Sequence, residues 1–344
     1  MTITIRDVAK FSGVSVKTVS RIINNEAPVR EDTRAKVQRA MDELGYRPSV
    51  LAQRFARGHS RVIGLLIHRG NNSEYAFDIL HGLMEICTAE GYGVSIFAYH
   101  REQGQSGQDV TQLIAQQFVD GLVFTPGCDD VPEQLAELDR MGAPFVRIWP
   151  QRPELPYPSV SAQDRQGAFE LISYLISLGH QRIGIITGEM DHADSPERLV
   201  GYQAALEAHQ IAFDASLVQY GDYSFASGRM CGRTLLKQNN PPTAIFASSD
   251  EMAVGVLHIA HELGIMVPKQ LSVAGFDDSR MSQRVLPLLT TVRQPVSEMG
   301  RIAAQILIRR LNGQTLAQTN VVLSTSLVIR NSTAPIDRNT SRSQ

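Results

Sequence analysis

Apolar residues near the amino terminus of the chain recur at helical spacing, and polar residues mark where the predicted helix begins. Val8 and Ala9 fall on one face of this helix. Asp7 stands three residues after Thr4, which is the spacing of a helix-starting capping box. Gly13 is suited to the left-handed conformation that ends a helix sharply. The pattern therefore predicts a short helix followed by a tight turn.

A second short helix is predicted to start at Ser15, a favourable N-cap residue. Its apolar face carries Val19, Ile22 and Ile23. The opposite face is basic and rich in hydroxyl groups, with Lys17, Arg21 and Asn24 at positions i, i+4 and i+7, Ser20 at its edge and Val16 near the apolar border. Two short helices joined by a glycine-centred turn, the second of them basic, are typical of a helix-turn-helix that enters the major groove of DNA.

The third predicted helix has an apolar face and ends at Gly45; its apolar positions are Val37, Ala40, Met41 and Leu44. By spacing alone, the three helices could be a small subdomain that Lys and Arg merely keep soluble. Charge argues against this, because residues 1–61 hold 12 Lys and Arg against 6 Asp and Glu, a net +6, whereas the rest of the chain carries −8. Positive charge gathered at one end favours a nucleic-acid-binding unit joined to a second part.

From Arg61 onward, short apolar runs alternate with helical stretches. The predicted strands are 62–67, 93–97, 121–124 and 143–148 in a first series, and 182–186, 244–247 and 271–276 in a second series. Continuous apolar strands between helices indicate parallel sheets covered on both faces. Two series predict two lobes, with a ligand at the carboxyl ends of the strands.

Composition narrows the class of protein. The 344 residues contain no run of about 18 apolar residues, so we expect no membrane span, and the amino terminus lacks the apolar stretch of a signal peptide. Cys87, Cys128 and Cys231 are widely separated, which favours buried thiols in a reducing cytoplasm.

The sequence gives no indication of an enzyme. It has no Gly-x-Ser-x-Gly elbow, phosphate loop or dinucleotide fingerprint. His258 and His261 lie three residues apart beside Glu262, but no third metal ligand is evident, so we expect neither a metal nor a cofactor.

Several motifs resemble the LacI/GalR family of bacterial repressors. They are Thr4–Asn24, Thr33-Arg34 and residues 44–48 (Leu-Gly-Tyr-Arg-Pro) in the amino-terminal part, and residues 178–184, 275–278 and 289–292 further along. The resemblance extends to about Arg330. It implies an all-α helix-turn-helix headpiece with a hinge helix, followed by an α/β two-lobed periplasmic-binding-protein-like domain with two parallel sheets. The implied divisions are 1–48 for the headpiece, 49–60 for the hinge, 61–335 for the effector-binding and dimerisation domain, in which the chain crosses three times between the lobes, and 336–344 for a disordered tail.

The resemblance also implies how the headpiece binds. Base edges are assigned to Val16, Lys17, Ser20 and Arg21, and phosphates to Thr4, Ser15, Thr18, Asn24 and Thr33. The hinge contributes Ala52, Gln53, Phe55 and Ala56, with Phe55 at the position where the family has a Leu that wedges into the minor groove. A homodimer would read a pseudo-palindromic operator in double-stranded DNA.

Carried over by position, the family's effector contacts fall on His68, Tyr75, Phe77, Thr125, Trp149, Asp194, Arg198, Ser249, Phe276 and Asp277. Aromatic faces with Arg and Asp suit a carbohydrate. Trp149 replaces a carboxylate that is frequent in sugar-responsive relatives, and Gln163 stands where Asp is common, so a larger or less polar ligand is an alternative.

The resulting hypothesis is a dimeric cytoplasmic regulator, associated with the nucleoid, that represses a carbohydrate utilisation operon. Two alternatives stay open. One is a regulator of the same family with a purine or nucleoside co-repressor, and the other is a solute-binding protein with the same lobes.

Overall fold

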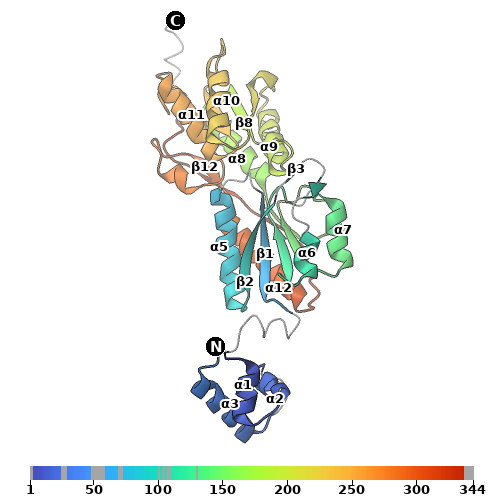
Figure 1. Cartoon of the computed structure of the whole chain (residues 1–344). Helices are drawn as coiled ribbons and strands as arrows, with labels where there is room; N and C mark the ends of the chain where they lie inside the picture. Colours follow the sequence, from blue (N-terminus) through green and yellow to red (C-terminus); the bar gives the residue numbers. More distant parts are fainter. Residues whose placement is uncertain are drawn as a thin grey trace.

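The computed structural model describes residues 3–24, 29–47, 59–68, 73–99, 101–102, 105–106, 110–128 and 131–336. These residues form a small helical headpiece and a larger part with two lobes (Figure 1). The hinge residues Ala52, Gln53, Phe55 and Ala56 lie outside the described residues, as does the predicted tail from residue 337 onward.

Three helices make up the described part of the headpiece: α1 (Ile5–Ser12), α2 (Val16–Ile23) and α3 (Glu31–Leu44). The backbone N–H and the hydroxyl of Thr4 both donate to Asp7 Oδ2, at 2.9 and 2.7 Å, which starts α1. Gly13 has φ 69°, the left-handed conformation that lets the chain turn between α1 and α2. Ser15 Oγ then accepts from the Thr18 N–H at 3.1 Å and caps α2.

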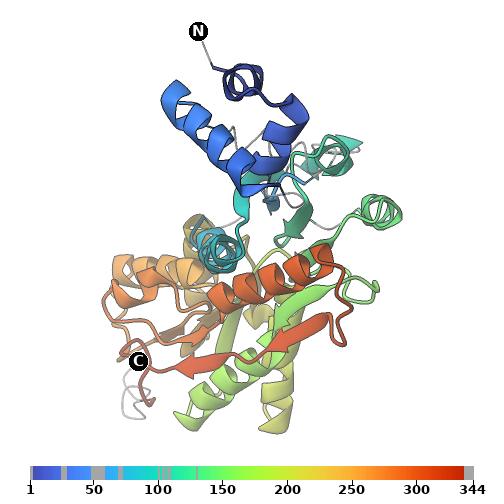
Figure 2. The ribbon, with the colours of Figure 1, turned by 90° about the horizontal axis from the view of Figure 1, so that it is seen from below.

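The helices pack on one another around a core of their own, and Figure 2 shows them gathered at the amino terminus. The buried members of this core are the predicted apolar positions, namely Val8, Ala9, Val19, Ile22, Val37, Ala40 and Met41. The apolar periodicity of the sequence is therefore confirmed in the headpiece.

The amino-terminal lobe is built on a parallel sheet, which among the described residues has six strands in the order β13-β7-β6-β5-β1-β2. The strands are β1 (Val62–His68), β2 (Gly93–Tyr99), β5 (Gly121–Phe124), β6 (Phe145–Ile148), β7 (Ser159–Ala162) and β13 (Asn320–Leu323). Helices α5 (Ser73–Ala89) and α12 (Val296–Leu311) cover one face. Helices α6 (Val110–Ala115) and α7 (Pro132–Arg140) cover the other.

The carboxy-terminal lobe repeats this plan around a second parallel sheet, in which four described strands lie in the order β11-β10-β8-β9. These are β8 (Ile183–Thr187), β9 (Val218–Tyr220), β10 (Ala244–Ala247) and β11 (Ser272–Ala274). Helices α8 (Asp164–Ser177) and α9 (Asp194–Ala208) pack on one face, and α10 (Phe225–Leu236) and α11 (Asp250–Glu262) on the other. The predicted two-lobed α/β fold is confirmed.

Short elements complete the described chain: β3 (Arg101–Glu102), β4 (Gln105–Ser106), η1 (Ala215–Leu217), η2 (Arg280–Gln283), β12 (Thr291–Arg293) and β14 (Ser326–Val328). Strand β12 pairs antiparallel with β14. The described chain passes between the lobes at 162–164, at 293–296 and at 323–326, because α12 and β13 belong to the first lobe whereas β12 and β14 belong to the second.

Helices α5 and α12 approach closely at two glycines. A Cβ atom on Gly82 would lie 1.8 Å from the Ser297 carbonyl oxygen, and one on Gly300 would lie 2.2 Å from that of Ile79. Neither contact is possible, so the absence of a side chain at both positions lets the two backbones pack together.

Candidate DNA-binding and effector sites

The outer face of α2 presents the side chains that the sequence assigns to base edges. Lys17 and Arg21 are exposed, Val16 is 42% exposed, and Ser20 is half-buried. Val19 and Ile22 on the opposite face are buried in the headpiece core. The helix is thus anchored on one side and offers cations and hydroxyl groups on the other.

The hydroxyl groups predicted to contact phosphates differ in exposure and in the hydrogen bonds that they form within the protein. Ser15 and Thr18 share a hydrogen bond of 2.9 Å at the exposed start of α2, where backbone N–H groups also favour an anion. Thr33 is half-buried in α3. Thr4 donates through both its N–H and its hydroxyl to Asp7, so a phosphate would have to replace this carboxylate.

The prediction that Asn24 lies on the exposed face of α2 is wrong. Asn24 is the C-cap residue of this helix and is only 7% exposed. Its Nδ2 donates to Ser20 Oγ at 3.3 Å. The helical period used for the prediction does not extend to a residue where the helix has already ended.

The proposed effector site lies where the two lobes meet. Helix α5 of the first lobe contacts η2 of the second, because Glu74 Oε1 accepts from the Arg280 N–H at 2.8 Å. Burial raises the pKa of the Tyr75 hydroxyl on α5 well above its ordinary value, and the charges of Asp164, Asp194 and Asp277 from the second lobe add to this. The carboxyl ends of β6, β8 and β11 lead into Trp149, the segment 188–193 and Asp277, as expected for a ligand site in parallel sheets.

Arg198 is the centre of charge in this site, and it is only 2% exposed. Its Nε donates to Asp164 Oδ2 at 2.9 Å, and its Nη2 lies 2.8 Å from the same oxygen. Nη2 is also 3.0 Å from Asp194 Oδ2 and 3.9 Å from Asp277 Oδ1. Nη1 donates to the carbonyl oxygen of Ser248. Three carboxylates thus surround one guanidinium.

Burial and crowding of these carboxylates change their protonation. Burial raises the pKa of Asp164 to about 7, although Arg198 acts in the opposite direction. Burial also raises the pKa of Asp277 well above its ordinary value, and the neighbouring carboxylates add to this. Burial alone would lower the pKa of Arg198, but Asp164 and Asp194 raise it well above the usual range, so the guanidinium stays charged.

Two predicted effector residues support this centre from within the core. The ring of Phe276 lies under the Arg198 guanidinium at 4.0 Å and is fully buried. Ser249 caps α11 by accepting from the Met252 N–H at 3.2 Å, and its own hydroxyl donates to the Tyr223 carbonyl oxygen. Both residues therefore shape the site rather than present free polar atoms.

Two predicted residues are not brought together with this cluster, and the side chain of a third is not described. Thr125 is buried and its hydroxyl donates to the Leu66 carbonyl oxygen at 2.8 Å. Phe77 is 65% exposed on α5, because two residues along a helix from Tyr75 it points in a different direction. The backbone of His68 ends β1, but its side chain lies outside the described part.

The sequence missed three residues that the structure places in the site. Asp164 is the carboxylate in tightest contact with Arg198, whereas the neighbouring Gln163 is exposed. The carboxylate of this region therefore stands one residue after Gln163.

Tyr223 and Gln294 are the other two. Tyr223 donates to Asp194 Oδ2 at 2.8 Å, and its ring lies 5.8 Å from the Arg198 guanidinium. Gln294 Nε2 donates to Asp277 Oδ1 at 3.0 Å. Both come from loops far apart in the sequence, and no local pattern marks them.

Several buried polar atoms in this region have no hydrogen-bond partner within the described protein. They are Tyr75 Oη and Trp149 Nε1 from the first lobe, and Asp164 Oδ1, Ser248 Oγ and Gln294 Oε1 from the second. Buried polar groups are rarely left unsatisfied in folded proteins. Their concentration here indicates a place for a polar ligand.

Backbone strain gathers at the same place. Trp149, Tyr223 and Asp277 have φ of 50°, 66° and 112°, values that side-chain-bearing residues seldom adopt. Such conformations persist where the surrounding structure holds them, frequently at ligand clamps.

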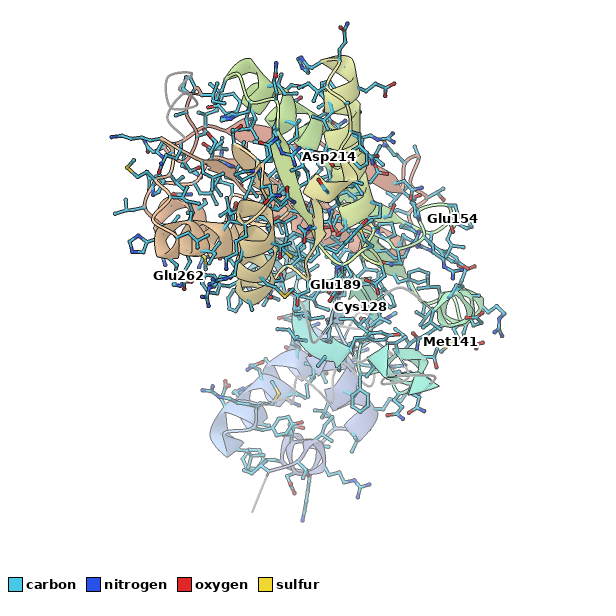
Figure 3. All side chains as sticks on the ribbon, turned by 90° about the horizontal axis from the view of Figure 1, so that it is seen from above. Cys128, Met141, Glu154, Glu189, Asp214 and Glu262 are labelled. Atoms are coloured by element: carbon cyan, nitrogen blue, oxygen red, sulfur yellow. The ribbon has the colours of Figure 1, made fainter. Side chains whose placement is uncertain are left out.

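Two groups of side chains have the composition of possible metal ligands. Glu262 forms ion pairs with Arg229, Arg233 and His258 at 2.6, 2.7 and 3.0 Å on the outer side of its lobe (Figure 3). Of the described residues, Glu189, Asp191 and His192 also have ligand atoms within 4.8 Å of one another, with both acids exposed.

A separate hollow of about 380 Å³ lies at the opposite edge of the first sheet. Its lining includes Tyr157 and Pro158, just before β7, and Arg310 near the end of α12. It is therefore distinct from the site around Arg198. None of the helices in the described part of the chain is both long and apolar enough to cross a bilayer.

Two regions of the chain match known protein families. Residues 4–49 match the family described as bacterial regulatory proteins, lacI family, and residues 172–333 match the periplasmic binding protein-like domain. Catabolite control protein A of Priestia megaterium is 33% identical, over 97% of this chain and 100% of that protein.

Two solved structures are similar over nearly the whole chain. The regulator CelR in complex with cellobiose shares 32% identity with a TM-score of 0.71, covering 96% of this chain and 99% of that one. The lac repressor dimer bound to operator and the anti-inducer ONPF shares 28% identity with a TM-score of 0.84, covering 97% and 100%.

Proposed function

Because this chain belongs to the lacI family of bacterial regulatory proteins, we propose that it is a dimeric repressor of transcription, controlled by a carbohydrate that binds between its lobes. The observation that carries the proposal is the pairing of two sites in one chain. One is the exposed basic face of α2, and the other is the buried cluster around Arg198 with its unsatisfied polar atoms.

The headpiece supplies contacts of two kinds. Lys17 and Arg21, with Ser20 and Val16, reach base edges, whereas Ser15, Thr18, Thr4 and Thr33 anchor phosphates. Asn24 acts at most from the end of the helix, because it is buried there. The similar lac repressor structure contains a dimer on operator DNA, which supports two headpieces reading a pseudo-palindrome.

The division of the chain follows the same proposal. Residues 1–48 form the headpiece, 49–60 the hinge with Phe55 as its minor-groove wedge, and 61–335 the effector-binding and dimerisation domain. A protein that binds operator DNA acts in the cytoplasm, at the nucleoid.

The lobe junction supports a carbohydrate as the effector. Carboxylates and a guanidinium pair readily with hydroxyl groups, and Tyr75 and Tyr223 add aromatic surface. The similar CelR structure contains cellobiose. Since residues from both lobes line the junction, an effector that binds there changes how the lobes sit on each other.

This change in the lobes would reach the headpieces through the hinge. Coupling between two such sites is typically about 1–3 kcal/mol and acts in both directions, so operator DNA also changes the affinity for the effector.

The test uses the full-length protein and fragments of bacterial genomic DNA. Fragments that it retains in competition with random DNA define an operator, and sugars and nucleosides are then screened for a change in operator affinity. A sugar that changes operator affinity at least 5-fold, roughly the lower end of such coupling, supports the proposal. A response to nucleosides alone would favour the purine or nucleoside alternative, and no selective retention of any fragment would overturn the proposal.

A further inference from the structure

We propose that the site between the lobes selects an uncharged, hydroxyl-rich effector and rejects ligands that carry phosphate or carboxylate groups. This inference rests on the proposed function, and it states the chemistry that the effector must have. It follows from the charges and from the unsatisfied hydrogen-bonding atoms of the site.

The one guanidinium of the cluster is already engaged by the protein. Each of the three nitrogens of Arg198 donates to, or lies within ion-pair distance of, an oxygen of Asp164, Asp194 or Ser248. An anionic ligand would compete with two carboxylates and a carbonyl oxygen for the N–H groups of Arg198. Arg198 therefore positions the carboxylates and does not offer a binding site for an anion.

The site has no net positive charge to offer an anion. Asp164, Asp194 and Asp277 stand against Arg198, so the four groups sum to −2 when all are ionised. Burial raises the pKa of Asp164 to about 7 and that of Asp277 well above its ordinary value, so a negative charge is costly here. With both carboxyl groups protonated, Arg198 and Asp194 still sum to zero. A phosphate would add up to two further negative charges at the same place.

Other described cations at the edge of the site are occupied as well. The Arg280 guanidinium lies 3.8 Å from both Glu74 and Asp78. Arg293 and Arg330 each pair with Asp278, at 2.6 and 2.5 Å. These pairs hold the segment that carries Asp277, whose own ion-pair partner is Arg198 at 3.9 Å.

The unsatisfied atoms require a ligand that both donates and accepts. The indole N–H of Trp149 can only donate, and the hydroxyl of Tyr75 faces the same junction from the first lobe. In the second lobe, Gln294 Oε1 can only accept a hydrogen bond. Asp164 Oδ1 can only accept one when its carboxyl group is ionised. A hydroxyl group satisfies both kinds of partner, whereas phosphate and carboxylate oxygens only accept and would face Asp164 and Gln294 without a bond.

The positions of these donors and acceptors also determine how the ligand is oriented between the lobes. The donor of Trp149, with that of Tyr75, calls for an acceptor such as a ring or glycosidic oxygen against the first lobe. The acceptors of the second lobe call for hydroxyl protons there. An uncharged sugar meets both conditions at once.

The experiment compares matched pairs of ligands by calorimetry and thermal shift on the full-length protein. Cellobiose and cellobiose phosphate, glucose and glucose 6-phosphate, ribose and ribose 5-phosphate, and adenosine and adenosine monophosphate differ in each pair by the phosphate. We expect at least one neutral member to bind and its phosphate ester to bind about 100-fold more weakly or not at all, the scale of a like-charge clash. Equal or tighter binding of a phosphate ester would overturn the inference.

A charge variant separates electrostatics from shape. Asp194→Asn keeps the size of the side chain and removes one negative charge. The ratio of the affinities for the neutral and the phosphorylated ligand should therefore fall about 10-fold. Glu207→Gln makes the same change of charge at an exposed position near the other end of α9 and should leave this difference in affinity intact. An unchanged difference in Asp194→Asn, with the melting temperature preserved, would contradict the role of the carboxylates.

Operator binding measured in the same preparations keeps the two proposals apart. If the protein still binds its operator but prefers a phosphorylated effector, or responds to no ligand of the panel, this inference is contradicted. The DNA-binding role would then still stand. Loss of specific operator binding itself would remove the proposed function.

Discussion

At the scale of single residues, Arg21 carries the most direct consequence of the DNA-binding proposal. It is exposed on the face of α2 opposite the buried Val19 and Ile22, so its removal leaves the headpiece core untouched. We predict that Arg21→Ala weakens specific operator binding by roughly 1–3 kcal/mol and relaxes the preference at one base pair.

Binding titrations on the operator and on single-base variants measure this prediction. Arg39→Ala, which removes an exposed arginine from α3, is the matched control and should keep the base preference. Unaltered discrimination at every position in Arg21→Ala would argue that this side chain contacts phosphates alone.

His180 is a second residue with a measurable consequence. Its Nδ1 lies 2.9 Å from Thr243 Oγ1, and its Nε2 lies 3.0 Å from Ser272 Oγ and 3.1 Å from the Ala334 carbonyl oxygen. Burial lowers the pKa of His180 below its ordinary value, although the contact with Ala334 acts in the opposite direction. The folded protein therefore favours the neutral ring.

The sign of the pH dependence follows from the lowered pKa. The stabilisation from the neutral ring is complete above about pH 6.5, the unfolded value, and is lost as the pH falls below it toward the folded pKa. We predict that His180→Gln shows a shallower loss of stability between about pH 7 and pH 5 than the unaltered protein. Denaturant unfolding at a series of pH values measures this, and parallel curves for the two proteins would refute it.

The sequence predicted single residues well where one regular element determines their position. The faces of α1, α2 and α3 follow from helical period alone, and their buried residues are those expected. The prediction was wrong for Asn24, because the end of a helix releases a residue from that period. Asp164, Tyr223 and Gln294 were missed because tertiary packing, and no local pattern, brings them to Arg198 and Asp277.

At the scale of elements, the contact between α5 and α12 is set by Gly82 and Gly300. Because a Cβ on Gly300 would overlap the Ile79 carbonyl oxygen, the two helices must separate to admit one. We predict that Gly300→Ala destabilises the first lobe by roughly 1–3 kcal/mol. Gly93→Ala, where an added Cβ would meet no atom closer than 3.9 Å, is the control and should change stability much less.

Unfolding by denaturant, with the slope checked for two-state behaviour, compares these variants. Equal stability of Gly300→Ala and Gly93→Ala would show that the helices do not need their close approach. The same α5 carries Tyr75 and Glu74 to the second lobe, so a displaced α5 should also weaken effector binding.

Strand predictions succeeded where the strand is a continuous apolar run and failed where its composition is mixed. The apolar runs at β1, β2, β5, β6, β8, β10 and β11 were recognised because both faces of these strands face cores or neighbouring helices. The missed strands have mixed composition, and several pair with partners distant in sequence; they are β7, β9, β12, β13 and β14.

At the scale of the whole molecule, two lobes connected by the described crossings at 162–164, 293–296 and 323–326 form a junction that is lined from both sides. The alternation of strands and helices was sufficient to predict two lobes. The assignment of β13 to the first lobe and β14 to the second was not accessible from pattern alone, because these strands are neighbours in sequence. Because β13 and β14 lie in different lobes, the chain between them forms one of the three connections beside the lobe junction.

The central claim is that the headpiece binds a specific duplex and that the two-lobed part controls this binding. Its most direct test is the affinity of the full-length protein for the selected operator and for random DNA of equal length, measured by fluorescence anisotropy with and without a neutral sugar that binds. We predict a preference for the operator of about 1,000-fold or more at physiological salt, and a change of at least about 5-fold on adding the sugar. Equal affinity for operator and random DNA, whether or not the sugar is present, would contradict the account.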